Sequence, residues 1–290
     1  MAPPATSRYR PRVRLILIVV GALWGAWSGL LLPRAAHRLA VEAEAPWNGQ
    51  CPDGHPITGT FAGWLGRARC TDTTGSYGPS PSPSLRPPTP ADDDSPAAPE
   101  TTSPAPCGPY GPSTPAVSIA TALVCAALAA ATGPRPELVV WLLAAPVAVL
   151  LALVDYRVHR LPDVLTLPLA AVTLALLGIA TALPADAGSW LTALLGGLAL
   201  GAAYLVLYLI NPAGMGFGDV KLALALGAAL GWYGWPVLVT GAFAGVLYGA
   251  MYGLGMVALR RAGRKTAIPL GPFMLGGAFT GLLLGAFAVA

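Results

Sequence analysis

The stretch NPAGMGFGDVKLALALGAALGW, residues 211–232, decides the fold, because it is nearly all apolar or glycine and yet carries two charges at its centre. The charged residues are Asp219 and Lys221. An ionisable side chain at the end of an apolar run of this kind is costly unless it has a partner or a function. The rest of the sequence must show whether the chain spans a membrane and what accompanies this carboxylate.

The composition of the chain answers the first question. Of its 290 residues 55% are hydrophobic and only 10% are charged, whereas a soluble domain has about 25% charged residues. A soluble core could not bury that much apolar surface and still leave a wettable exterior. We therefore expect an all-α, polytopic membrane protein whose surroundings are the lipid bilayer. The net charge of +4 comes without a dense basic and aromatic patch, so we expect no nucleic-acid partner.

Apolar runs predict about eight transmembrane helices, with one long hydrophilic loop after the first. The predicted spans cover residues 13–32, 116–132, 137–154, 164–183, 189–210, 220–232, 236–259 and 270–289. The run at 220–232 is short. It can serve as a transmembrane span only if its helix begins near Gly218 and is partly buried by neighbouring helices.

The sequence divides into four parts by composition. They are the N-terminus and first transmembrane helix (1–32), a cysteine-containing loop domain (33–75), a Pro/Ser-rich segment (76–115) and a membrane domain (116–290). The Pro/Ser-rich segment has almost no large aliphatic side chains. It cannot bury enough surface to offset the entropy of ordering, so we expect it to be disordered.

Basic loops predict the orientation of the spans. The segment RRAGRK at 260–265 is the most basic loop and should be cytoplasmic. Alternation then places 211–219, 155–163 and the 33–115 segment on the same side and the N-terminus outside. The arginines before the first span argue for the opposite orientation of that helix, which therefore stays open.

Three aspartates fall at the predicted cytoplasmic boundary, namely Asp155, Asp163 and Asp219. Asp155 ends one apolar run and Asp219 opens another, so packing can bring the two together. Two neighbouring carboxyl groups can share a proton and supply an acid and a base, as activation of water against a peptide bond requires. The alternatives are structural: Asp219 caps its helix, and Asp155 pairs with Arg157 or Arg160.

Three motifs resemble segments of one known family, the type IV prepilin peptidases, which are membrane aspartic proteases of the GxGD type. GMGFGDVKLALALGAALGW (214–232) is similar to the GxGD segment, DYRVHRLPDVLTLPL (155–169) to the first aspartate segment, and AIPLGPFMLGGA (267–278) to the segment that opens the last span. They occur in family order with family-like spacing. The resemblance covers about residues 116–290.

This resemblance implies a membrane aspartic endopeptidase that cleaves the leader of prepilins or pseudopilins just before their hydrophobic helix. It implies an inner-membrane protein with its active site at the cytoplasmic face. Asp155 and Asp219 would be the catalytic pair. The resemblance gives supporting or substrate-binding roles to Asp163, Gly216, Gly218, Lys221, Pro269 and Gly271.

The first loop partly resembles a second feature of the same family, a zinc-binding loop. GLLLPRAAHRLA (29–40) is similar to the family segment after the first helix, which many members follow with two CxxC pairs that bind zinc. That zinc domain accompanies methylation of the product by S-adenosylmethionine. Cys51 and Cys70 match the first cysteine of each pair, and Gly54 and Thr73 replace the second.

The loss of the second cysteine from each pair determines which cofactors we expect. Cys51, Cys70 and His55 offer three ligands, whereas a tetrahedral zinc site needs four, and Cys107 lies far along the Pro/Ser-rich segment. We therefore expect neither zinc nor S-adenosylmethionine, and no cofactor for proteolysis. If the first helix has the opposite orientation, the loop is external, and Cys51 and Cys70 could instead form a disulfide.

Two functions other than a protease remain as alternatives, although the intact aspartate pair argues against an inactive protein. A proton- or cation-coupled transporter would use them to bind ions, but we find no convincing internal repeat, and both lie at the edge of the membrane rather than its middle. An inactive scaffold for pilus assembly is the third alternative.

Overall fold

The computed structural model describes residues 6–41, 45–52, 54–70, 108–212, 214–259 and 269–289. These residues form helices and connecting segments, with no strand among them. The helices are α1 Thr6–Leu39, α2 Thr60–Gly63, α3 Thr114–Thr132, α4 Glu137–Val158, α5 Asp163–Ala180, α6 Trp190–Ile210, α7 Phe217–Trp232, α8 Trp235–Ala258 and α9 Gly271–Ala288. The Pro/Ser-rich segment predicted to be disordered lies mostly outside the described residues, as do Cys107, Thr73 and the basic loop at 260–265.

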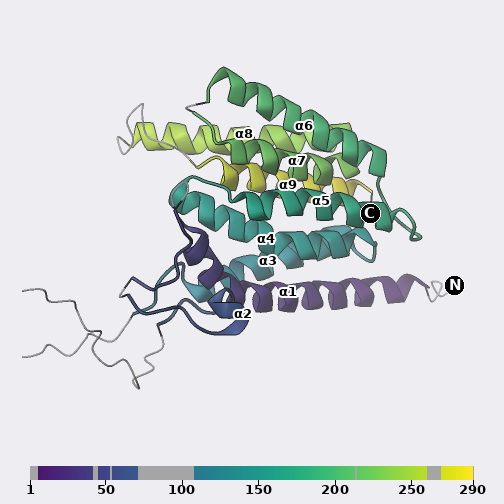
Figure 1. Cartoon of the computed structure of the whole chain (residues 1–290). Coiled ribbons are helices and arrows are strands. Elements are labelled where there is room, and N and C mark those ends of the chain that lie inside the picture. The colour runs from purple at the N-terminus through teal and green to yellow at the C-terminus, as the bar shows by residue number, and fades with distance from the viewer. Residues whose placement is uncertain are drawn as a thin grey trace, which may run out of the picture.

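Long apolar helices run side by side in a bundle (Figure 1). Seven of the described helices are long and apolar enough to cross a membrane: α1, α3, α4, α5, α6, α8 and α9. The prediction of an all-α, polytopic membrane protein is therefore confirmed. The eighth predicted span corresponds to α7, which has 16 residues.

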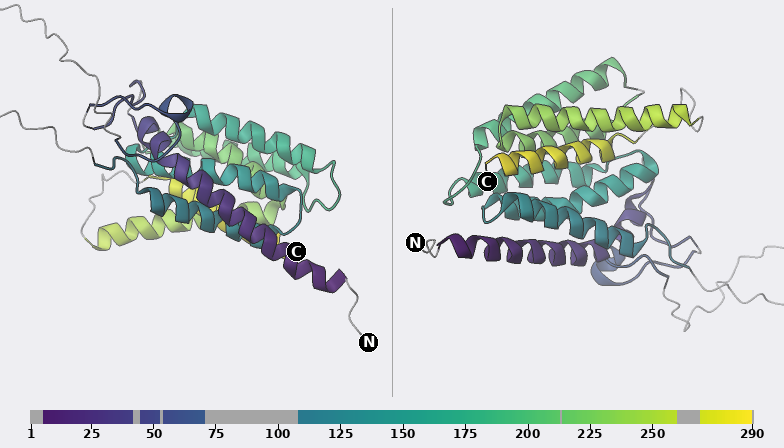
Figure 2. Two further views of the ribbon diagram at one scale, coloured as in Figure 1. Left: turned by 90° about the horizontal axis from the view of Figure 1, so that it is seen from below. Right: turned by 180° about the vertical axis from the view of Figure 1, so that it is seen from behind.

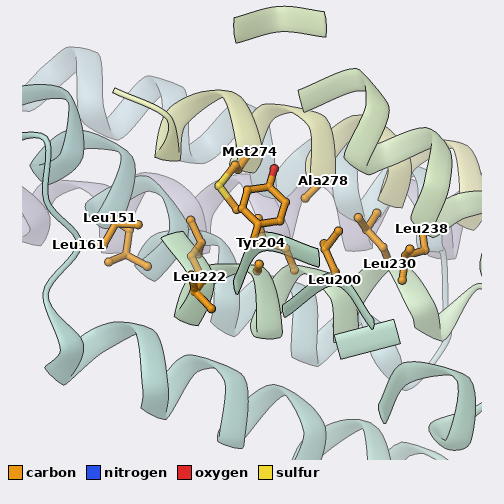
Figure 3. Packing of buried hydrophobic residues seen from close by; sticks show 12 residues of the cluster. Leu151, Leu161, Leu200, Tyr204, Leu222, Leu230, Leu238, Met274 and Ala278 are labelled. Carbon is orange, nitrogen blue, oxygen red and sulfur yellow. The ribbon is translucent and has the colours of Figure 1, made fainter. Parts of the chain in front are cut away.

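Helix α7 lies in the middle of the bundle, which explains how so short a helix is accommodated. It begins at Phe217, close to the predicted start near Gly218, and most of its side chains are buried. Leu222 and Leu230 of α7 pack among Leu200 of α6, Met274 of α9 and other apolar side chains (Figure 3). Neighbouring helices therefore cover α7 on several sides.

Glycines allow α6 and α7 to pack closely. At Gly227 of α7 an added Cβ would collide with the backbone of Gly196 and would lie 2.8 Å from Cβ of Leu200. At Gly231 it would lie 2.5 Å from the carbonyl oxygen of Thr192. Helix backbones that approach this closely are typical of membrane bundles built on small residues.

Helix α1 is longer than the predicted span and continues past Pro33 to Leu39. Its last part has apolar residues at helical spacing, Leu32, Ala35, Ala36 and Leu39, which pack against Leu150 and Val154 of α4. This packing keeps the segment helical where the sequence has arginine and histidine residues.

A small loop domain, residues 45–70 with 108–112, sits against the end of α1. Its core contains Cys51, Ile57, Ala68 and Tyr110. Arg34 of α1 donates to the carbonyl oxygens of Thr58 and Arg67, each at 2.9 Å. The short α2 in this domain has left-handed backbone angles at Phe61 and Ala62, so it is a single turn and not a regular α-helix.

The loop domain, the α4–α5 connection and the α6–α7 connection gather at one end of the bundle, and the two termini lie at the other (Figures 1 and 2). The prediction that the first long loop shares a face with residues 155–163 and 211–219 agrees with this arrangement. We refer to this end as the aspartate end, because Asp155 and Asp219 lie there.

Candidate functional site

Asp155 and Asp219 line one small pocket at the aspartate end, although 64 positions separate them in the chain. The pocket has a volume of about 180 Å³, and its other lining residues include His159, Leu161, Gly216 and Lys221. Asp155 is 4% exposed and Asp219 is 7% exposed. The two carboxyl groups are close enough to interact electrostatically. The structure thus brings together the pair that the sequence predicted.

Asp155 is held by the end of one helix and the start of another. It lies in the last turn of α4, which ends at His159 in a left-handed conformation (φ 53°). The backbone N–H of Gly271, the first residue of α9, donates to Oδ2 of Asp155 at 2.9 Å. Among the described residues Asp155 forms no ion pair, so the alternative in which Arg157 or Arg160 neutralises it is wrong.

Asp219 occupies the first turn of α7, where the helix dipole favours a negative charge. The N-cap residue of this helix is Gly216, so Asp219 does not occupy the capping position. Gly218 brings α7 against the α4–α5 connection, since an added Cβ there would lie 2.9 Å from Cβ of Leu161. Gly216 is much less crowded, because its nearest such contact is Oδ2 of Asp219 at 3.7 Å.

The supporting residues Asp163 and Lys221 meet at the mouth of the pocket. Nζ of Lys221 lies 2.5 Å from Oδ2 of Asp163, in an ion pair between the starts of α7 and α5. Asp163 is 62% exposed and Lys221 only 16%. The Lys221 ammonium also lies 4.9 Å from the centre of the Phe217 ring. This pair therefore joins the two helices that flank the pocket.

Pro269 and Gly271 differ in what they contact. Gly271 is in direct contact with Asp155 through its N–H, and an added Cβ would lie 2.8 Å from the same carboxyl oxygen. Pro269 is buried just before α9. Sequence reasoning placed Gly271 in the site by resemblance alone and missed Leu161, whose contact with Gly218 depends on how α4 and α5 are joined.

A second cluster of functional groups lies in the loop domain. The Sγ atoms of Cys51 and Cys70 are 3.5 Å apart, and Nδ1 of His55 lies 3.6 Å from the first and 3.4 Å from the second. A disulfide bond is about 2.05 Å long, so the two cysteines are not bonded to each other in this structure. The disulfide that the sequence left open is not present.

Two isolated β-bridges lie beside these side chains. The N–H of Cys51 donates to the carbonyl oxygen of His55 at 2.9 Å, inside a β-bridge between Gln50 and Pro56. A second β-bridge, Arg69 with Pro109, lies directly before Cys70. The three ligand atoms lie within 4.8 Å of one another.

The spacing of these atoms fits a metal ion. In a tetrahedral zinc site with Zn–S of about 2.3 Å and Zn–N of about 2.0 Å, neighbouring ligand atoms are about 3.5–3.8 Å apart. The measured separations of 3.4–3.6 Å come close to this range. The two thiol groups and the imidazole are also the ligand types that zinc prefers.

Residues 138–254 match the model of the type IV leader peptidase family. This segment contains Asp155, Asp163 and Asp219 with their helices. The family resemblance seen in the motifs is thereby confirmed.

Curated relatives agree with the family match. A protein named prepilin leader peptidase/N-methyltransferase from Aeromonas hydrophila is 35% identical over 174 residues, covering 59% of this chain and 58% of the relative. A protein of the same name from Pseudomonas aeruginosa is 36% identical over 137 residues, covering 47% of this chain and 46% of the relative. Another from Burkholderia pseudomallei is 30% identical over 185 residues, covering 61% of this chain and 56% of the relative. The chain thus spans about half the length of the curated relatives it matches. No solved structure matches the chain.

Proposed function

We propose that this chain, whose residues 138–254 carry a domain of the type IV leader peptidase family, is a membrane aspartic endopeptidase that cleaves the leader peptide of prepilins or pseudopilins. The observation that carries the proposal is the burial of Asp155 and Asp219 in one pocket at one end of the bundle. The names of the curated relatives support it. The transporter alternative has no support among the matches.

The proposed mechanism uses the two carboxyl groups in different protonation states. One takes a proton from water as general base, and the other donates a proton to the carbonyl oxygen of the scissile peptide bond. The N–H of Gly271 orients Asp155 through its hydrogen bond to Oδ2. The first turn of α7 places Asp219 across the pocket.

The proposed location is the inner membrane, with the aspartate end at the cytoplasmic face. The apolar helices support a multi-pass membrane protein. The basic segment at 260–265 follows α8, whose last residues lie at the aspartate end (Figure 1). Lysine and arginine residues are enriched in cytoplasmic loops, which supports this orientation.

Co-expression with candidate prepilins tests the proposed activity. N-terminal sequencing and mass measurement of the pilin would show leader removal by the native chain. Asp155→Asn and Asp219→Asn should each abolish it while the protein still accumulates in membranes. Full processing by either variant would contradict the proposal. The same mass spectrum reports whether the new N-terminus is methylated, an activity that the proposal does not include.

We also propose that Cys51, His55 and Cys70 supply three of the four ligands of a structural zinc ion, contrary to our expectation from the sequence. The observation that carries this proposal is the triangle of ligand atoms with sides of 3.4–3.6 Å. A bound zinc ion would link the segments that carry Cys51 and Cys70, in a loop domain whose apolar core is small. Metal analysis of the purified chain should give about one zinc ion, and Cys51→Ser with Cys70→Ser should remove it. A metal-free native protein would contradict the proposal.

A further inference from the structure

An apolar cavity of about 260 Å³ lies inside the membrane bundle. Helices α3, α4, α5, α7 and α9 all contribute to its walls. Its lining is almost entirely aliphatic and aromatic, and Thr173 of α5 supplies the only hydroxyl group among its lining residues. A cavity with these walls suits an apolar occupant and not water.

The cavity reaches to within one helical turn of Asp155. Ala152 lines it and lies three residues before Asp155 on α4. On the opposite wall, Pro272 lines it and directly follows Gly271, the donor to Asp155. From Ala152 the lining continues along α4 to Trp141, about 16 Å away at 1.5 Å per residue. The cavity therefore extends from the neighbourhood of Asp155 along α4 into the bundle.

One face of α4 makes room for this cavity. Ala144, Ala145, Ala148 and Ala152 all line it, at spacings that bring them to one side of a helix. Small residues in membrane helices usually allow a neighbouring helix to pack closely. Here they leave an open space, because α5, α7 and α9 do not fill the volume beside them.

The cavity is separated from the outer surface by few side chains. A second depression of about 170 Å³ lies between α4 and α5, and Val164 and Val172 of α5, which line it, are exposed. Both hollows share Ala144, Leu169 and Thr173 as lining residues.

Each of the two helices that form this boundary has a proline in its interior, Pro146 in α4 and Pro168 in α5. A proline removes one helical hydrogen bond and allows the helix to bend at that point. The seam between α4 and α5, where the two hollows share lining residues, therefore offers a route from the lipid into the cavity.

We propose that this cavity binds the apolar stretch of the substrate that directly follows the scissile bond, and that the stretch enters between α4 and α5. The proposal rests on the proposed function. A prepilin leader is followed by a hydrophobic helix, so cleavage at the aspartates requires an apolar site close to them. The cavity lies at this position and has the required lining.

Filling the cavity tests the proposal. Ala148→Leu adds an isobutyl group to the middle of the α4 wall, whereas the matched Ala175→Leu adds the same group to an exposed position of α5 outside both hollows. With the prepilin that the native chain processes, Ala148→Leu should raise KM at least about tenfold, because the larger side chain takes up volume that the apolar stretch of the substrate would need. Ala175→Leu should leave it unchanged.

A compensating change in the substrate separates lost binding from misfolding. If the first large apolar residues after the scissile bond are replaced by alanine, Ala148→Leu should process that prepilin better than the native prepilin. Native processing of the unaltered prepilin by Ala148→Leu would overturn the inference. It would leave the proposed function standing, because only the aspartate variants test that function.

Photo-crosslinking supplies a test that does not depend on activity. A benzophenone amino acid in the apolar stretch of the prepilin, bound to the Asp155→Asn variant, should crosslink to residues 144–152 or to α9. A diazirine-labelled phospholipid is the competing probe. If the lipid alone reacts with these residues and prepilin does not displace it, the cavity is a lipid site and the inference is wrong.

Discussion

The backbone N–H of Gly271 donates a hydrogen bond to Oδ2 of Asp155 at 2.9 Å, and thereby joins the first residue of α9 to the last turn of α4. The two residues lie 116 positions apart in the chain. A buried carboxylate keeps its orientation only when its oxygens have such partners. Gly271 therefore acts as a positioning residue for the proposed catalytic pair.

Replacing Gly271 by alanine should impair this arrangement. The added Cβ would lie 2.8 Å from Oδ2 and 3.0 Å from Cγ of Asp155, so the carboxyl group must move. We expect a loss of about 10²-fold in kcat, the size associated with a misplacement of about 1 Å. Gly255→Ala in α8 is the matched control, because nothing lies within 4 Å of its added Cβ. Similar prepilin processing by both variants would contradict the prediction.

The two glycines of the GxGD motif should differ in their tolerance of alanine. At Gly218 the new Cβ would lie 2.9 Å from Cβ of Leu161 and 3.0 Å from its carbonyl oxygen, which would push α7 away from the α4–α5 connection. At Gly216 the nearest such contact is 3.7 Å away, and the backbone angles suit any residue. Gly218→Ala should lower kcat/KM at least about tenfold and Gly216→Ala by much less. Equal losses would show that the packing against Leu161 is not what Gly218 provides.

Asp163 should contribute far less to prepilin processing than Asp155, although the two residues lie on either side of the same α4–α5 connection. Asp163 is 62% exposed and pairs with Lys221, and exposed ion pairs contribute little. Asp163→Asn and Lys221→Met should therefore each lower prepilin processing by less than about fivefold. Their double variant should be no worse than the more impaired single one. A loss as large as that of Asp155→Asn would instead place Asp163 among the catalytic residues.

Close packing of α6 and α7 should make Gly227 critical for stability. A side chain at this position would collide with the backbone of Gly196 and with Leu200. Gly227→Val should lower the unfolding temperature in detergent, in line with an overpacking cost of about 1–3 kcal/mol, while Gly255→Val, placed in open space, should change it much less. The measurement is thermal unfolding followed by circular dichroism. Equal unfolding temperatures for the two variants would contradict the packing described for α6 and α7.

The sequence allowed much of this fold to be predicted, because each long apolar run can only be a membrane helix. The start of α7 near Gly218 followed from the length that a run of this kind needs. The extension of α1 to Leu39 did not, since it depends on Leu32 and Ala36 packing against α4. Burial against another helix is a tertiary effect that hydropathy along the chain does not contain.

The candidate sites were predictable to different degrees. Asp155 and Asp219 were found because a carboxylate at the end of an apolar run is costly and because their motifs resemble a family. The close approach of Cys51, His55 and Cys70 could not be foreseen, since it depends on how the loop domain packs around Ile57, Ala68 and Tyr110. Counting cysteine pairs led to an expectation of no zinc, which stays untested; the zinc site proposed above rests on the spacing of the three ligand atoms.

The shortness of α7 has a consequence for where a substrate would be cut. Its 16 residues extend about 24 Å, whereas the hydrocarbon core of a bilayer is about 30 Å thick. A helix that spans less than the core leaves its first turn, with Asp219, recessed beneath the headgroups, unless the surrounding lipid thins to meet it. Because neighbouring helices enclose α7, water must reach the aspartates along a path that is lined by protein. The length of one enclosed helix would then set the depth at which a membrane-anchored chain is cleaved.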